Sequence, residues 1–79
     1  MDWREHVVSD SEVLAGKPVV RGTSLAVDLL LGLLAAGWRS AQIREHYLQL
    51  RPESLRAVFA FAVEALAEEG FYLLLRRAV

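Results

Sequence analysis

The chain has 79 residues, a length that predicts one small domain, residues 1–79, and such a domain buries only about 60% of its unfolded surface. Nine Lys and Arg residues stand against ten Asp and Glu residues, so the net charge is −1 and the basic excess typical of a strong nucleic-acid binder is missing. The absence of cysteine excludes disulfides and cysteine-based zinc or redox sites. Hydrophobic residues make up 54% of the sequence, an excess that predicts an interface with another chain.

The sequence shows no pattern for a membrane span, a signal peptide or a metal site. Its densest apolar run, from Leu25 to Trp38, is shorter than the roughly 20 residues that a membrane span needs. The N-terminus does not have the pattern of a signal peptide. His6 and His46 stand alone, without a partner at metal-binding spacing. We therefore expect a cytoplasmic protein with no membrane association, no metal and no other cofactor.

Residues 5–24 are predicted to form a β-hairpin arm. Residues Glu5 to Val8 suit a short strand, and Ser9 to Ser11 form a turn cluster. Pro18 to Arg21 offer a second strand, with the proline at the first position, where a missing N–H does least harm. The two strands are expected to pair as a wide hairpin.

The first helix is predicted from Leu25 or Ala26 to Ala36, with Thr23 and Ser24 as candidate caps and Gly37 at its end. The run is apolar on nearly every side, so it must pack against more than one neighbour. Gly32, in its middle, costs about 1 kcal/mol relative to alanine. That cost predicts a close helix contact at this position.

Two further helices complete a predicted three-helix core, residues 25–69. Ser40 is expected to cap a short helix from Ala41 to Tyr47, and Pro52 to begin a longer helix that runs to about residue 69. The longer helix has one apolar stripe suited to the core, made of Leu55, Phe59, Ala62, Val63 and Leu66.

The surplus of apolar residues predicts an oligomer. Additional positions on the third helix widen its stripe beyond one core contact, and residues 70–79 form an apolar tail whose periodicity does not distinguish strand from helix. The predicted oligomer interface consists of Val58, Phe61, Ala65, Phe71 and Leu74.

The stretch AGKPVVRGTS, residues 15–24, does not fit a phosphate-binding loop. Ser11 stands where that loop needs its first glycine, and Pro18 stands where it needs a hydroxyl residue. The sequence also lacks a G-x-S-x-G elbow and a cysteine nucleophile. We therefore expect no enzymatic activity.

Residues 40–66 have the layout of a helix-turn-helix: a short helix, a turn and a longer helix. Between residues 37 and 62 four arginines oppose two glutamates, and this local charge of +2 permits weak phosphate contact. The candidate nucleic-acid contacts are Arg44, Arg51 and Arg56. The alternative is a solvated face that touches no DNA.

The segments SDSEVLAGKPVVRGTSLAV and LLLGLLAAGWRSAQIREHYLQLRPESLRAVFAFAVEAL, within residues 5–66, resemble the prokaryotic domain-of-unknown-function family 433. The positions that match the family pattern are Gly16, Lys17, Pro18, Arg21, Gly22, Thr23, Gly37, Ile43 and Tyr47. Two positions depart from it, because Ser24 replaces the usual arginine and Leu48 the usual proline.

The resemblance implies a helix-turn-helix-like domain of winged-helix-like or homeodomain-like type. It also implies the antitoxin of a type II toxin–antitoxin module, similar to VapB-like proteins, that binds a PIN-like ribonuclease toxin and represses its own operon. In this role Lys17, Arg21 and Thr23 of the hairpin would contact the partner. The alternative is that Gly16, Gly22 and Thr23 only shape the entry to the first helix. The alternatives are a stand-alone dimeric DNA-binding regulator and an oligomeric scaffold without enzymatic activity.

Overall fold

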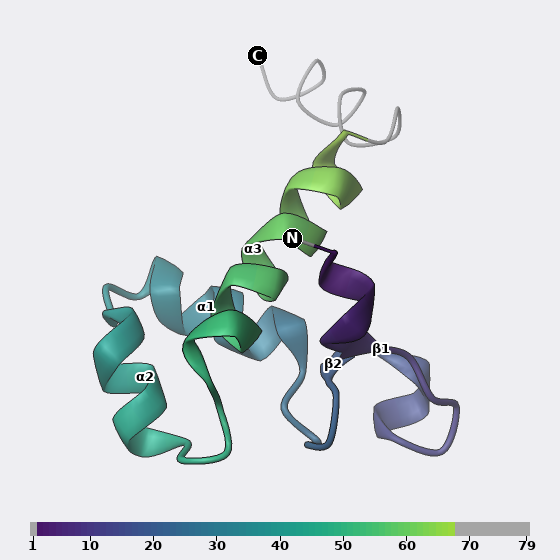
Figure 1. Cartoon of the computed structure of the whole chain (residues 1–79), viewed down its shortest axis with the longest axis horizontal. Coiled ribbons are helices and arrows are strands. Elements are labelled where there is room, and N and C mark those ends of the chain that lie inside the picture. The colour runs from purple at the N-terminus through teal and green to yellow at the C-terminus, as the bar shows by residue number, and fades with distance from the viewer. Residues whose placement is uncertain (1, 68–79) are drawn as a thin grey trace.

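The computed structural model describes residues 2–67 and places a two-stranded antiparallel hairpin before three helices (Figure 1). The elements in chain order are the 3-10 turn η1 (Trp3–Glu5), β1 (Val7–Val8), the 3-10 turn η2 (Leu14–Gly16), β2 (Val19–Val20), α1 (Val27–Ala35), α2 (Ser40–His46) and α3 (Pro52–Leu66). The predicted order, a hairpin and then three helices in a mainly helical chain, is confirmed.

The hairpin is short and is continuous with the start of α1. Val7 pairs with Val20, and Val8 pairs with Val19. On its other edge β2 forms a bridge from Val19 to Ala26, and the Val27 N–H donates to the Pro18 carbonyl at 2.9 Å. The first turn of α1 is therefore fixed to the hairpin by backbone hydrogen bonds.

Thr23 shapes the turn before α1 rather than capping the helix. Its hydroxyl donates to the Val20 carbonyl at 2.8 Å and accepts from the Leu25 N–H at 3.0 Å. The N-cap of α1 is Ala26, which makes no side-chain cap bond, and Ser24 is exposed. The prediction that Thr23 or Ser24 caps the helix was wrong, because the hairpin already pairs the backbone at this end.

Gly37 ends α1 as predicted. Its φ is +98°, a left-handed conformation that glycine adopts without steric cost. Its N–H donates to the Leu34 carbonyl at 3.1 Å, and the Trp38 N–H donates to the Leu33 carbonyl at 3.0 Å. These two bonds form a Schellman motif, which satisfies the last carbonyls of the helix.

The starts of α2 and α3 differ in how well the sequence predicted them. Pro52 is the first residue of α3, as expected. The predicted Ser40 cap was wrong: Arg39 is the N-cap of α2, and its N–H donates to Oε1 of Gln42 at 2.9 Å. Because glutamine supplies the acceptor from within the helix, Ser40 becomes the first helical residue.

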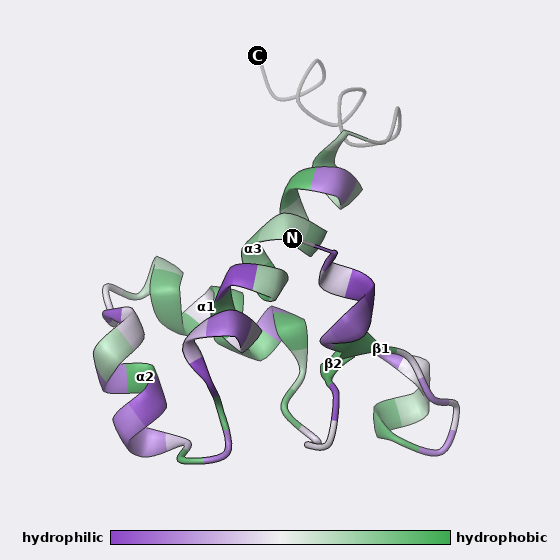
Figure 2. Cartoon of the chain, in the orientation of Figure 1, coloured by the Kyte–Doolittle hydropathy of each residue, from purple (hydrophilic) through white to green (hydrophobic). Residues whose placement is uncertain are grey.

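The core lies between the hairpin and the three helices, and Figure 2 shows hydrophobic residues along α1 and along α3 up to its last turn. Leu30 of α1, Ile43 of α2 and Val58 of α3 are fully buried in it. The other buried members of this cluster are Val7, Val20, Leu25, Val27, Leu50, Leu55 and Ala57. Each helix thus contributes at least one residue with no contact with solvent.

The face of α3 that packs inward matches only part of the predicted stripe, because Leu55 is buried as predicted but Leu66 is 54% exposed. Val58, predicted to lie in an oligomer interface, is buried in the core of its own chain, so that prediction was wrong. Phe59 and Val63, predicted to be core residues, are 45% and 69% exposed. The helix is rotated relative to the prediction because its apolar residues cover more than one face, so periodicity alone does not select the buried one.

Gly32 makes no close contact within the described chain. It is exposed, and a Cβ at this position would meet no atom within 4 Å. The predicted close helix contact was therefore wrong.

Candidate functional site

The three arginines predicted to contact nucleic acid do not form one site. Arg44 and Arg56 line a cavity of about 180 Å³ between α2 and α3, together with Ser40 and Phe59. Arg51 lines a different cavity at the start of α3. The sequence could not separate them because their distribution depends on how α2 crosses α3.

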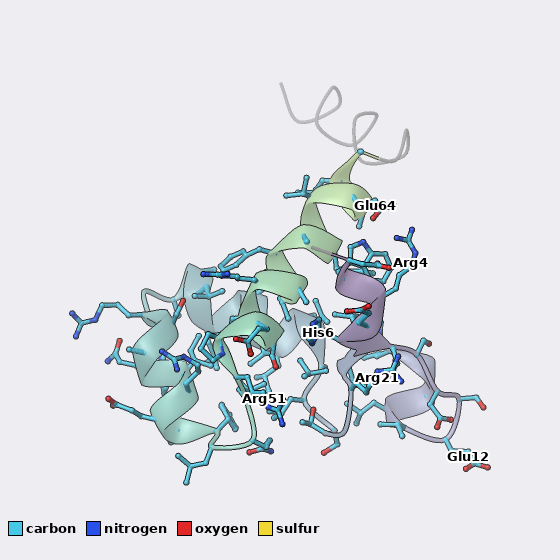
Figure 3. The ribbon with its side chains drawn as sticks, in the orientation of Figure 1. Arg4, His6, Glu12, Arg21, Arg51 and Glu64 are labelled. Atoms are coloured by element: carbon cyan, nitrogen blue, oxygen red, sulfur yellow. The ribbon has the colours of Figure 1, made fainter. Side chains whose placement is uncertain are left out.

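Arg51 instead shares its cavity with two residues predicted to bind a partner protein, Arg21 and Thr23. This cavity has a volume of about 430 Å³ and its lining also includes His6 and Gln49. Figure 3 shows the labelled Arg21 and Arg51 in the lower half of the molecule, on either side of His6. The folded chain thus brings together the first turn, the hairpin and the α2–α3 turn, which lie far apart in the sequence.

Lys17, the remaining residue predicted to bind a partner, lies at one end of an apolar groove. Its Nζ pairs with Oδ2 of Asp28 at 3.2 Å, and both side chains are largely exposed, so the ion pair contributes little to stability. The positive charge of Lys17 is therefore offset by its neighbour on α1.

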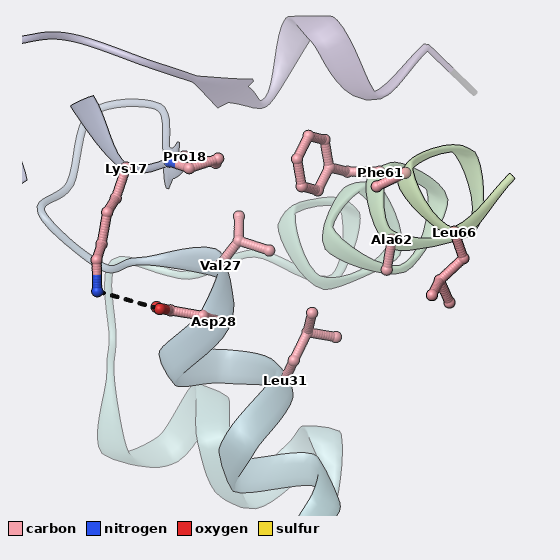
Figure 4. Close-up of a pocket in the computed structure, with 9 residues that line it drawn as sticks. Lys17, Pro18, Val27, Asp28, Leu31, Phe61, Ala62 and Leu66 are labelled. Atoms are coloured by element: carbon pink, nitrogen blue, oxygen red, sulfur yellow. Dashed lines mark hydrogen bonds and ion pairs between the residues drawn. The ribbon is translucent and has the colours of Figure 1, made fainter. Parts of the chain in front are cut away.

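The apolar groove has a volume of about 420 Å³ and lies between the hairpin, α1 and α3 (Figure 4). Apart from the Lys17–Asp28 pair, its lining consists of hydrocarbon side chains: Pro18, Val27, Leu31, Phe61, Ala62, Ala65 and Leu66. We call this surface the α1–α3 groove. Its size lies within the range of about 300–1,000 Å³ that small-ligand pockets occupy, but its lining offers almost no hydrogen-bonding group.

Two of the residues predicted to form the oligomer interface, Phe61 and Ala65, line this groove and are partly buried. Phe61 also packs edge-on against the Trp3 ring, with 4.9 Å between ring centroids. Phe71 and Leu74, the other two besides Val58, lie outside the described residues.

The N-terminal turn η1 is hydrogen-bonded to the C-terminal part of α3, a contact that the sequence did not predict. The Trp3 indole N–H and Nη2 of Arg4 both donate to the Glu64 carboxylate, the latter at 3.1 Å. The hydrogen bond from Trp3, reinforced by that from Arg4, holds the pKa of Glu64 below its usual value. Trp3 and Glu64 are 61 residues apart, and no local sequence pattern predicts a contact between positions at that separation.

Residues 2–67 contain neither a cluster of metal-binding side chains nor a helix suited to a membrane. No three His, Cys, Asp or Glu side chains in this part of the chain are grouped so that they could hold a metal ion. Within the same residues no helix has the length and apolar character needed to cross a membrane.

The fold and the groove define a small, mainly helical protein with an N-terminal hairpin and an exposed, hydrocarbon-lined surface between α1 and α3. The chain belongs to the family described as "Protein of unknown function (DUF433)", which it matches over residues 7–62. This match extends from β1 to residue 62 of α3 and confirms the family that the sequence motifs indicated. No curated protein and no solved structure matches the chain.

Proposed function

We propose that this protein is a protein-binding module, the antitoxin of a type II toxin–antitoxin pair, and that the α1–α3 groove receives an apolar segment of a PIN-like ribonuclease. The resemblance to antitoxin-associated members of the family supplies the identity of the partner. The structure supplies a surface with the chemistry that such a contact needs.

The observation that carries the proposal is the hydrocarbon lining of the α1–α3 groove. Full burial of a Leu or Val side chain is worth about 1.5–3 kcal/mol, and Leu66 at the edge of the groove is 54% exposed. A partner that covered Leu66 would recover roughly half of that amount from this residue, or about 1 kcal/mol. A lining with so few polar groups favours an apolar protein segment over a polar small molecule.

The experiment is to purify the tagged chain from its native host at physiological salt and to identify the proteins that accompany it by mass spectrometry. We expect a PIN-like nuclease in stoichiometric amount, and we expect the added chain to inhibit its ribonuclease activity. Purification of the chain without any nuclease, or with a nuclease that stays fully active, would contradict the proposal.

A pair of matched variants tests whether the groove is the contact surface. Leu66→Glu places a carboxylate at the groove, whereas Leu48→Glu makes the same change at a residue that is 85% exposed and lies in the α2–α3 turn. Burial of a charge against hydrocarbon is unfavourable, so Leu66→Glu should weaken nuclease binding by at least about tenfold. Leu48→Glu should bind as the wild type does. Equal binding by the two variants would remove the groove from the proposal.

The proposal includes self-association through the outer face of α3. Phe59 and Val63 lie one helical turn apart and are both substantially exposed, which is unfavourable for a monomer in water. Light scattering at micromolar concentration should give at least a dimer, and Val63→Glu should shift it toward the monomer. A folded wild-type chain that is strictly monomeric would contradict this part of the proposal.

A second candidate function is that of a DNA-binding regulator with a helix-turn-helix. It is favoured by one observation: Arg44 and Arg56 line the same cavity between α2 and α3, and none of the described residues that line it carries a carboxylate. In this case Arg56→Ala should weaken binding to a promoter fragment, and affinity should fall steeply with salt. Absence of promoter binding at low salt would rule this function out.

A further inference from the structure

The cavity of about 430 Å³ at the start of α3 has an arginine held in place on one of its walls. Nε of Arg21 donates to the Glu5 carbonyl at 2.9 Å, and Nη2 donates to the Arg4 carbonyl at 3.2 Å. The Arg21 backbone N–H also donates to the His6 carbonyl at 2.7 Å. A guanidinium has five N–H donors, so these bonds fix its position and leave the rest for a ligand.

The acceptors that hold Arg21 are neutral carbonyl oxygens, so its positive charge is not cancelled. No ion pair between described residues involves Arg21 or Arg51. Among the described residues that line this cavity, Glu5 is the one with a carboxylate, and two are arginines. The lining residues therefore carry a net positive charge of one, two arginines against one glutamate.

Arg51 lies on the opposite side of the same cavity, immediately before the first residue of α3. Its backbone N–H donates to the Ser54 hydroxyl at 3.3 Å, which fixes the backbone that carries the side chain. Ser54 is itself buried and lines the cavity, and Gln49 adds an amide group. Polar groups therefore line the cavity both from the hairpin and from the start of α3, and Figure 3 labels Arg21 and Arg51, one from each.

We propose that this cavity binds the phosphate group of a nucleotide between Arg21 and Arg51. Two guanidinium groups that make no ion pair among the described residues match the charge of a phosphate, which accepts paired hydrogen bonds from arginine. The volume exceeds the need of one phosphate and falls in the range of small-molecule sites, so Gln49 and Ser54 are available to the attached sugar or base. The nucleotide is either a free molecule or part of a strand. This site is separate from the α1–α3 groove and its occupation does not depend on the proposed function.

The test is a titration of the ¹⁵N-labelled full chain at low salt, followed by NMR of the backbone amides and the arginine Nε–H groups. The probes are inorganic phosphate, a nucleoside 5′-monophosphate and a 12-nucleotide single-stranded DNA. We expect saturable shifts for residues that line the cavity, including Arg21 Nε and the amide of Ser54. Saturation by the monophosphate indicates a free nucleotide, whereas saturation by the DNA alone indicates a strand.

Two matched variants distinguish a defined site from general attraction by charge. Arg51 and Arg39 are both N-cap residues of helices, both side chains are exposed, and Arg39 does not line the cavity. Because the loss of a charge-assisted hydrogen bond costs affinity, Arg51→Ala should weaken binding by about tenfold or more. Arg39→Ala should leave binding within about twofold of the wild type, since Arg39 does not line the cavity.

Three results would overturn the proposal. The first is the absence of saturable shifts with all three probes at millimolar concentration. The second is an equal loss of affinity in Arg39→Ala and Arg51→Ala. The third is shifts confined to residues outside the cavity. None of these results bears on nuclease binding by the α1–α3 groove, which is measured without any of the three probes.

Discussion

Replacement of Gly32 by alanine should stabilise the protein. Gly32 lies in the middle of α1, its φ is not in the left-handed region, and a Cβ at this position would meet no atom within 4 Å. Alanine can therefore adopt the native backbone without a clash. The substitution also restricts the unfolded chain, which lowers the entropy lost on folding.

The expected gain follows from the intrinsic preference of alanine for helix. An interior helical glycine is less favourable than alanine by about 0.8–1.0 kcal/mol, and no lost contact offsets that difference at Gly32. For a domain of this size, 1 kcal/mol corresponds to a rise in Tm of about 4–8 °C. The assay is thermal and urea unfolding followed by circular dichroism at 222 nm.

Gly37→Ala is the matched control, because it is the same substitution at the residue that follows the C-cap of α1. A Cβ at Gly37 would also meet no atom within 4 Å, so the two sites differ in backbone conformation rather than in space. At a φ of +98° a residue with a Cβ is strained, and the left-handed conformation costs about 1–2 kcal/mol. Gly37→Ala should therefore lower Tm.

The reasoning would be refuted if Gly32→Ala left Tm unchanged or lowered it. A Tm that fell only at concentrations where the chain self-associates would indicate that another copy packs closely against Gly32. Unfolding is therefore measured over a range of protein concentrations.

Two further predictions concern the core and the N-terminal turn. Ile43→Ala should lower the free energy of unfolding by about 2–5 kcal/mol, because Ile43 is fully buried between the helices, and urea titration measures the loss. Glu64→Gln should be less stable than the wild type at pH 7, because the pKa of Glu64 is lowered by Trp3 and Arg4 and its ionised form favours the fold. This contribution is complete above the ordinary value of 4.5 and is lost as the pH falls through the lowered folded-state pKa. The difference in urea midpoint between wild type and variant should therefore be smaller at pH 3 than at pH 7, and an equal difference at both pH values would contradict the assignment.

Three features are each formed by residues that no local sequence pattern connects: the α1–α3 groove, the cavity lined by Arg21 and Arg51, and the hydrogen bonds from the N-terminal turn to Glu64. Trp3 and Glu64 are separated by 61 positions, and Arg21 and Arg51 were predicted to serve different partners. Sequence periodicity identifies which residues are apolar or charged along one element. It does not specify which elements cross, and these crossings place the residues in one surface.

Local signals predicted this protein well where one residue type satisfies one backbone requirement. Pro52 begins α3, because a missing N–H is harmless at the first helical position, and Gly37 ends α1, because its φ is positive. The paired valines of β1 and β2 lie in segments that the sequence predicts to be strands, because β-branched side chains favour extended backbone.

Tertiary structure alone decided which face of α3 is buried. Val58 lies in the core while Phe59, its neighbour in sequence, is 45% exposed, although both are large apolar residues. The choice depends on the volume left between the hairpin, α1 and α2, because a packed core accepts only the side chains that fill it without voids. The sequence by itself determined the order of the hairpin and the three helices through local backbone preferences. The packing of those elements determined the α1–α3 groove and the cavity between Arg21 and Arg51, because both are spaces between segments and not properties of any one of them.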